Sequence, residues 1–216
     1  MLYVTCYTLQ ATRLMARHIG PKTRLSRRAG TQLFPKDAKI FTKRNYPPGM
    51  HTQIKRRVSG YGARMLEKQK AKWLYGILER QFRRYYEKAA KKPAETGLLI
   101  LQYLETRLDN VVFRLGFAQT RPQARQLVSH GFFEVNGKKT DIPSYEVRVG
   151  DVISVKESKK AGKYIQSQKP LLSKFKPAEW LRLEAEKLFG KVVSLPTPEN
   201  MESILNTQFI IEHYSR

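Results

Sequence analysis

The clearest pattern in the sequence is a helical one between residues 61 and 92. Apolar side chains recur there at spacings of three and four, from Trp73 through Phe82 to Ala89, and form one stripe. Lysines and arginines occupy the other faces, with few acids to pair with them. We therefore expect one helix over 61–92 whose stripe, tyrosines included, packs in a core and whose basic faces meet phosphates.

The pattern changes after this helix. Pro93 and Gly97 interrupt it and mark a linker or a domain boundary. Leucines at 101, 104 and 108 then predict a second apolar helix, and Gly116 ends the apolar residues that follow.

A short helix is predicted over residues 121–130. Thr120 and Gln123 have the spacing of a capping box, and Gly131 provides a left-handed end. Arg121 and Arg125 lie four residues apart and so share a face at the positive end of this helix, where phosphates are favoured.

A small antiparallel sheet is predicted to follow. Asn136-Gly137 is the dipeptide most suited to a type I′ hairpin, since both residues tolerate positive φ. Lys138 and Lys139 follow this turn directly. Residues 147–149 and 152–155 read as two further strands around a Gly-Asp turn, so the fold class is α+β.

Residues 16–60 read differently, as a basic arm with little regular structure. Glycines and prolines punctuate the segment, and bases occur throughout it. A flexible solubilising tail is one interpretation. Leu33, Phe41 and other apolar residues give the arm something to pack, which favours ordering along RNA.

Composition identifies the class of partner. The 216 residues carry 41 Lys or Arg and 18 Asp or Glu, a formal net charge of +23, and 22 of these bases against 5 acids lie in residues 15–97. Such a field attracts a polyanion: nucleic acid is the leading partner and anionic lipid the weaker one. A single cysteine, Cys6, excludes a disulfide framework, and no apolar run has the length of a membrane span.

Residues 1–14 form an N-terminal extension. It lacks the basic start, the long apolar stretch and the Arg/Ser richness of targeting peptides. We interpret it as a short extension, with Met15 as the candidate start of the protein proper.

The motifs of residues 107–116, 120–131, 135–138 and 149–153 resemble, in their order and spacing, the S4 RNA-binding domain. Outside them, residues 15–21, 25–28, 46–51, 67–70, 75–76, 79–83 and 212–216 are similar to bacterial small-subunit ribosomal protein S4. The resemblance covers residues 15–216.

The resemblance implies a domain organisation. A basic arm, 15–60, leads to a helical domain, 61–104, which is completed by 196–216. The S4 domain, 105–165, is inserted into it, and 166–195 is a connecting segment.

The resemblance also implies a role. It predicts a primary binder of the five-prime domain of small-subunit rRNA that nucleates assembly. It further predicts a position close to protein S5 and to messenger RNA where it enters the subunit, an effect on decoding accuracy and, in some bacteria, repression of its own operon. No small-molecule substrate, cofactor or membrane is implied, and the location is the cytoplasmic ribosome, with an organellar ribosome as the alternative.

The sequence departs from the family at several positions. Thr23 and Ser26 occupy the first two positions of a four-cysteine zinc site and the later cysteines are absent, so we expect no metal. Leu66, Trp73, Pro122 and Phe132 also differ from the usual residues. Leu66 and Trp73 share a helix face, and our hypothesis is that this face packs on protein, with residues 1–14 as the candidate.

The expected RNA contacts combine the charge argument with the resemblance. They are Arg17, Lys22, Arg24, Arg27, Arg28, Arg44, Lys55, Arg56, Arg57, Tyr61, Arg64, Lys68, Lys70, Lys72, Arg83, Arg107, Arg121, Arg125, His130, Lys138 and Lys139.

Two other classes of function were weighed. S4 domains also occur in pseudouridine synthases and tRNA synthetases, but this sequence has no phosphate-cradling Gly-rich loop and no histidine pair at metal-binding spacing, so no catalytic residue is expected. A stand-alone RNA chaperone would lack the arm and the helix of 61–92.

Overall fold

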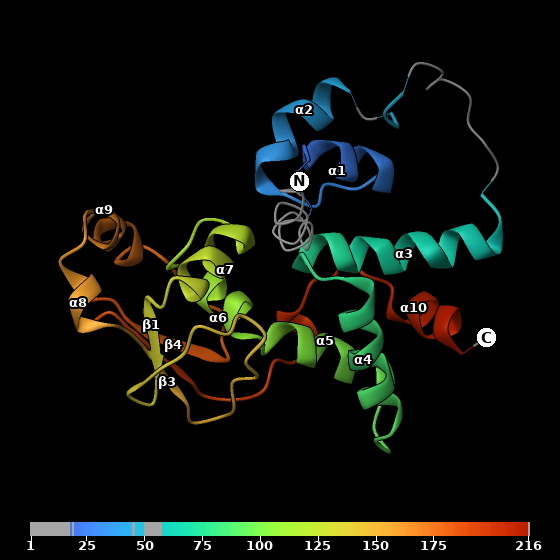
Figure 1. Ribbon diagram of the computed structural model, residues 1–216. Helices are drawn as coiled ribbons and strands as arrows, with labels where there is room; N and C mark the ends of the chain where they lie inside the picture. The colour runs from blue at the N-terminus through green and yellow to red at the C-terminus, as the bar shows by residue number, and fades with distance from the viewer. Residues whose placement is uncertain (1–17, 19, 45, 50–57, 216) are drawn as a thin grey trace, which may run out of the picture. The chain divides into compact units, whose positions relative to one another are not determined.

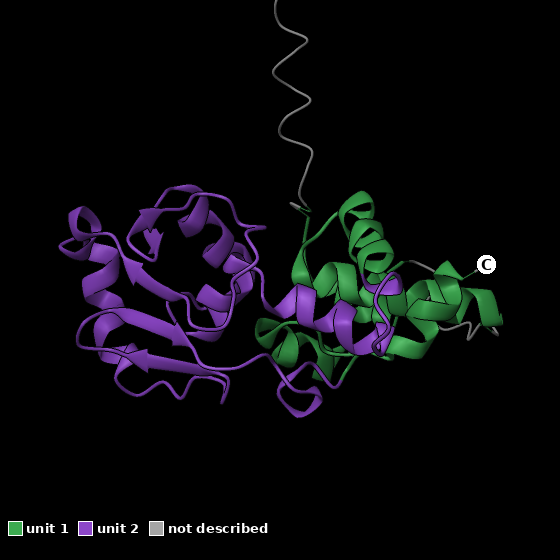
Figure 2. Cartoon of the chain, turned by 90° about the horizontal axis from the view of Figure 1, so that it is seen from below, with its two compact units in different colours: residues 1–88, 204–216 green, residues 89–203 purple. Residues whose placement is uncertain are grey.

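The computed structural model describes residues 18, 20–44, 46–49 and 58–215. They form two compact units, one of residues 1–88 with 204–216 and the other of residues 89–203 (Figure 2). We call them unit 1 and unit 2. The mixture of helices with a small antiparallel sheet confirms the α+β class. In the part of the chain that the structure describes, no helix has the length and hydropathy to cross a membrane.

The arm of unit 1 is more regular than the sequence indicated. It contains helix α1 (Thr23–Ala29), a 3-10 turn η2 (Pro35–Asp37) and helix α2 (Ala38–Lys43), seen at the top of Figure 1. Leu33 is buried and Leu25 half-buried, so the scattered apolar residues of the arm hold these short helices together. The prediction of an arm with little regular structure was wrong for its described residues.

The single helix expected over 61–92 is two helices. Helix α3 (Gly60–Tyr75) ends at Gly76, whose φ of 64° is left-handed, and α4 (Glu79–Ala90) starts three residues later. The break could not be seen in the apolar pattern, because Leu74 and Ile77, on either side of Gly76, keep the helical spacing of three. The core assignment of the stripe is confirmed for Leu74, Phe82 and Ala89, all buried.

Helix α10 (Thr207–Tyr214) completes unit 1 and packs along α3 (Figure 1). The ring of Tyr214 stacks on Tyr86 of α4, with centroids 4.8 Å apart. Its hydroxyl donates a 2.6 Å hydrogen bond to Glu79 Oε1. The last turn of the chain thus fixes the junction between α3 and α4.

Unit 2 starts with helices α5 (Thr96–Glu105), α6 (Leu108–Arg114) and α7 (Arg121–Ser129). The apolar helix predicted through Leu108 ends earlier, at Glu105. The Thr120 hydroxyl caps α7 by accepting from the Gln123 amide, as expected. The reciprocal bond differs from a capping box, because Gln123 Oε1 accepts from the amide of Gln119 instead of Thr120.

A five-stranded antiparallel sheet packs against α6 and α7 (Figure 1). Its strands are β1 (Phe133–Val135), β2 (Lys138–Lys139), β3 (Val152–Val155), β4 (Leu181–Glu184) and β5 (Phe189–Val192), in the order β2-β1-β3-β5-β4. Asn136 and Gly137, at φ 51° and 76°, form the predicted hairpin turn. Residues 147–149, predicted as a strand, are not one.

The segment 166–195 does more than connect. Helix α9 (Lys163–Leu172), which follows the short α8 (Glu157–Lys160), precedes β4 and β5, and β5 pairs directly with β3. Trp180, Leu188 and Val192 are buried in the core shared with α6 and α7. This segment therefore supplies two of the five strands.

The boundaries of the units also differ from those expected at 104/105 and 195/196. The structure divides the chain at 88/89 and 203/204, so α5 and the 3-10 turn η3 (Pro198–Asn200) belong to unit 2.

Candidate nucleic-acid interface

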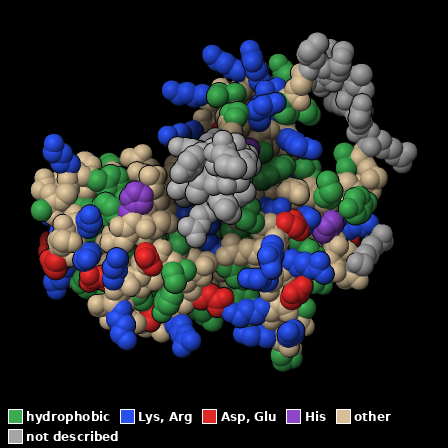
Figure 3. Space-filling view, in the orientation of Figure 1, with side chains coloured by type: hydrophobic (Ala, Val, Ile, Leu, Met, Phe, Trp, Pro, Cys, Tyr) green, Lys and Arg blue, Asp and Glu red, His purple; other side chains and the backbone are tan. Residues whose placement is uncertain are grey.

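The described arm carries a nearly uncompensated positive charge. Residues 18–49 contain eight bases and one acid, Asp37. Figure 3 shows the Lys and Arg side chains projecting from the region of α1 and α2. Since the Asp37 side chain is buried, the solvent-facing charge of this region is positive. A surface of this kind binds phosphates without reading base sequence.

Asp37 is buried because it organises the arm. Its carboxylate accepts hydrogen bonds from the Thr23 hydroxyl, at 2.8 Å, and from the Ser26 hydroxyl. The Ser26 hydroxyl also accepts from the amide of Leu33. The two residues at the expected first positions of a zinc site thus serve as donors to a carboxylate, which ties α1 to η2. In the described residues, no cluster of three or more His, Cys, Asp or Glu side chains has the arrangement of a metal site.

The predicted contacts of the arm are mostly accessible. Arg24, Arg28 and Arg44 are exposed. Arg27 is half-buried, because its guanidinium donates to the Tyr46 carbonyl and lies over that ring. Burial, together with repulsion from Lys36, lowers the pKa of Lys22. Arg17, Lys55, Arg56 and Arg57 lie outside the described residues, as does the extension of residues 1–14.

The bases of α3 are paired, contrary to expectation. Lys68 and Lys72 both donate to Glu79, at 3.0 and 2.7 Å, and Lys70 donates to Glu67 at 2.5 Å. Two more of the predicted RNA contacts also have a carboxylate partner. Arg64 lies 3.5 Å from Glu212, and Arg83 pairs with Glu87. Tyr61 is exposed and Leu66 and Trp73 are half-buried. The prediction of a phosphate-facing α3 therefore fails for Lys68 and Lys70, whose charges are buried against acids of the same unit.

The three donors to Glu79 control its ionisation. Burial by itself raises the pKa of this carboxyl, but hydrogen bonds from Lys72, Tyr214 and Lys68 hold the pKa at about 2. Conversely, burial and the hydrogen bond to Glu79 raise the pKa of the Tyr214 hydroxyl. Glu79 is therefore ionised at neutral pH and links α3, α4 and α10.

We predict that Glu79→Gln removes a pH-dependent part of the stability of unit 1. Because the pKa of Glu79 lies below its ordinary 4.5, the contribution is complete above that pH and is lost as the pH falls towards 2. Glu79 is 44% exposed, so solvent screening limits the effect at neutral pH to about 1 kcal/mol. Urea titrations followed by Trp73 fluorescence, in a Trp180→Phe background, measure it. Glu87→Gln, in an exposed pair with Arg83, is the control and should change little; equal losses would contradict the prediction.

Arg107 is not available to RNA. Its side chain is fully buried, and its guanidinium donates to both carboxylate oxygens of Asp109, at 3.0 and 2.7 Å. A side chain with no exposed surface has no path to a phosphate. The expected RNA contact is corrected to a structural role at the start of α6.

Arg121 begins α7 and Arg125 lies one turn later, as predicted, but neither side chain is open to solvent. Arg121 donates to Asn110 Oδ1 at 2.8 Å and to Glu202 at 2.6 Å. Arg125 lies 3.8 Å from Asp109. The Glu202 partner comes from the end of unit 2, so no local pattern shows it.

Three predicted contacts of this domain are accessible: His130 at the end of α7, and Lys138 and Lys139 in the hairpin are exposed. The turn between β1 and β2 is fixed, because the Asn136 side chain donates to Asp151 at 2.8 Å and accepts from the amide of Val152 at 2.9 Å. Phe132, one of the departures, is half-buried under the ammonium of Lys159, and Pro122 occupies the first turn of α7, where it costs no hydrogen bond.

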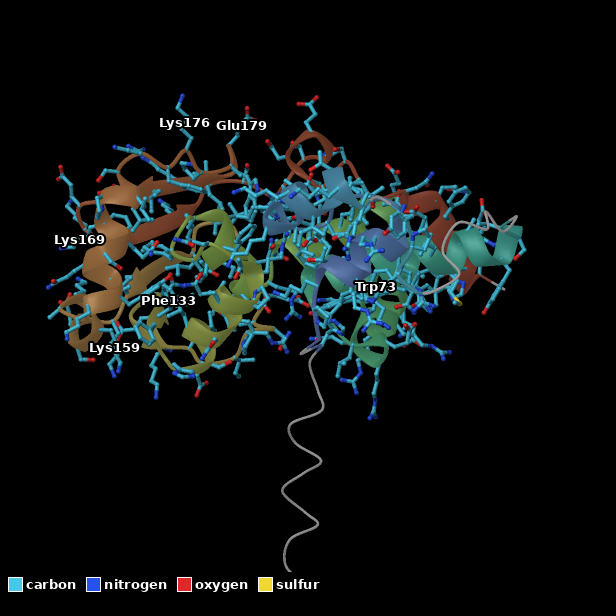
Figure 4. The ribbon with its side chains drawn as sticks, turned by 90° about the horizontal axis from the view of Figure 1, so that it is seen from above. Trp73, Phe133, Lys159, Lys169, Lys176 and Glu179 are labelled. Atoms are coloured by element: carbon cyan, nitrogen blue, oxygen red, sulfur yellow. The ribbon has the colours of Figure 1, made fainter. Side chains whose placement is uncertain are left out.

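A further basic segment was missed by the sequence reasoning. Residues 156–176 contain seven lysines and one acid, Glu157. The charge argument from the sequence concerned residues 15–97 and did not include this segment. Figure 4 shows Lys159, Lys169 and Lys176 around α8, α9 and the residues that follow. The signal that identifies the cluster is seven lysines within 21 residues.

Comparisons with known protein families match both the helical part of the chain and the domain that contains α7 and the hairpin. The family model "Ribosomal protein S4/S9 N-terminal domain" matches residues 17–105, and the model "S4 domain" matches residues 106–153. The two matches meet next to the boundary expected at 104/105. The fold and these matches define the class as a ribosomal protein that carries an S4 domain.

Relatives match over nearly the whole chain. It is 52% identical to "Small ribosomal subunit protein uS4" of Roseiflexus castenholzii and 51% identical to that of Chloroflexus aurantiacus, each over 94% of this chain and 100% of the relative. The protein of the same name from Acetivibrio thermocellus is 49% identical over 94% of this chain and its own full length. The chain belongs to the small ribosomal subunit protein uS4 family, a family of structural ribosomal proteins.

Proposed function

We propose that this chain binds the five-prime domain of small-subunit rRNA as an early step of subunit assembly. The observation that carries the proposal is the arm, where eight bases surround one buried acid in residues 18–49. Arg24, Arg28 and Arg44 reach phosphates from this surface, and Lys138 and Lys139 do so from the hairpin of unit 2.

The same proposal extends to the neighbours of the family in the subunit. Contact with protein S5 links the chain to decoding accuracy, and the chain lies close to messenger RNA where it enters the subunit. Repression of its own operon belongs to the same proposal. The membership of the uS4 family supports these roles.

The test is the salt dependence of binding to a five-prime-domain rRNA fragment. The triple change Arg24→Gln, Arg28→Gln and Arg44→Gln should reduce the slope of log K against log [salt] by about 2–3, since each phosphate contact contributes about 0.7–0.9. Filter binding between about 50 and 200 mM salt measures the slope.

The matched control is Lys187→Gln. This base is exposed, is paired with Glu184 of its own unit and is not among the expected RNA contacts. It should leave the slope unchanged. A slope that is the same in the wild type and in the arm variant would reject the arm as the phosphate-binding surface.

A further inference from the structure

A groove of about 680 Å³ opens on unit 2 between the end of α6 and the residues after α9. Apolar side chains line most of it, among them Phe113, Leu171 and Phe175. Leu171 and Phe175 are 51% and 43% exposed, so the groove has an open apolar wall. Arg114, Lys174 and Lys176 also line it, and no acid is among its described lining residues.

Phe175 is held in a fixed position within the groove. Gly116, with φ 83°, lies against the Cδ1 side of the ring, and a Cβ atom at this glycine would be 2.6 Å from Cδ1 of Phe175. The Phe175 amide donates to the carbonyl of Leu172, which continues the last turn of α9. Part of the ring is therefore packed while Phe175 stays 43% exposed.

The charges around this ring fit an anion. Lys174 and Lys176 flank Phe175 in the sequence and are both exposed. The nearest acid along the chain, Glu179, accepts a hydrogen bond from Asn200 at 3.2 Å and does not line the groove. Figure 4 shows Lys176 extending outward on the segment that follows α9.

We propose that this groove binds an unpaired RNA nucleotide, whose base stacks on Phe175 and whose flanking phosphates meet Lys174 and Lys176. Proteins that bind single-stranded nucleic acids combine an aromatic side chain with nearby lysines or arginines. Each nucleobase can stack on the aromatic ring, and the phosphates on either side of it meet the positive charges. The charge favours this occupant over an apolar protein segment, because phosphates on either side of a stacked base would meet the two exposed lysines that flank the ring. The inference rests on the proposed RNA-binding function and names the element of RNA that unit 2 takes: a bulged or single-stranded nucleotide.

The test uses the full chain and a twelve-nucleotide oligoadenylate with 2-aminopurine at its centre. Stacking on Phe175 should quench the fluorophore, and Phe175→Ala should abolish the quenching and weaken binding on the order of tenfold, the effect of one stacked base. A blunt-ended self-complementary duplex of the same length, which offers no unpaired base, should bind Phe175→Ala and the wild type equally.

Leu171→Ala is the matched control, since it truncates an equally exposed apolar side chain of the same groove that has no π-face. It should leave quenching and affinity within twofold of the wild type. Unchanged Trp180 fluorescence shows that each variant is folded, because this side chain is buried in the core of unit 2.

The outcomes separate the inference from the function on which it rests. Wild-type protein that binds the five-prime-domain fragment but does not quench 2-aminopurine overturns the nucleotide site alone. Equal weakening of oligonucleotide binding by Phe175→Ala and Leu171→Ala, with no quenching, overturns the stacked base in favour of a general apolar contact. Quenching that depends on Phe175 while the rRNA fragment does not bind supports the site and rejects the proposed function.

Discussion

Replacing Asp109 by Ala is expected to destabilise unit 2 by about 3–5 kcal/mol, the range for removing one partner of a buried ion pair. The Arg107 side chain is 0% exposed and Asp109 accepts from it through both carboxylate oxygens. Without that carboxylate, a buried guanidinium loses its bidentate acceptor. Arg125, 3.8 Å from Asp109, loses this contact as well.

The measurement is a urea titration followed by Trp180 fluorescence in a Trp73→Phe background, so that the signal comes from unit 2. The double change Arg107→Met and Asp109→Leu is the control. Apolar replacement of a whole buried pair is often neutral, so the double variant should recover most of the stability. A loss below about 1 kcal/mol in Asp109→Ala would contradict the prediction.

The double variant also tests the corrected role of Arg107. If Arg107 has a structural role only, the stable double variant should bind the rRNA fragment as tightly as the wild type does. A stable variant with weakened binding would return Arg107 to the RNA contacts.

Trp180→Ala is expected to destabilise unit 2 by about 3–5 kcal/mol, the cost of truncating a large buried aromatic side chain. Trp180 is 1% exposed and lies in the core with residues of α6, α7 and β3. Its carbonyl accepts from the amide of Val193 at 2.9 Å, so the residue also anchors the end of β5.

Far-UV circular dichroism in urea measures the effect, since the fluorophore itself is removed. Trp180→Phe keeps a ring in the same space and should cost less than half as much. A small effect of Trp180→Ala would mean that residues 166–195 connect the domains without contributing to the core, as the sequence alone indicated.

The features that could be predicted from the sequence are those decided within a few residues. Thr120 caps α7, Gly131 at φ 65° follows its end, and Asn136-Gly137 forms the turn. Each depends on the backbone preference of the residue itself, so no distant contact is needed to find it. Even there, the partner of Gln123 was one residue away from the expected one.

The pairing of the charges could not be predicted in this way. Tyr214 meets Glu79 across 135 positions of the chain, and Arg121 meets Glu202 across 81. On one continuous helix over 61–92, Glu79 would lie 11 and 7 residues from Lys68 and Lys72, beyond the spacing of helical ion pairs. The break after α3 brings Glu79 to both lysines. Exposure, and with it the availability of a base to RNA, depends on such distant contacts.

The sequence by itself determined that this chain is α+β, strongly basic and similar to the S4 family, because composition and short motifs depend only on the order of the residues. Only the tertiary structure decided which bases face solvent. It leaves Arg24, Arg28, Lys138 and Lys139 exposed, and pairs Lys68, Lys70 and Arg107 with carboxylates. The physical reason is that a buried charge must be matched by an acid, and folding brings that acid from wherever the chain returns.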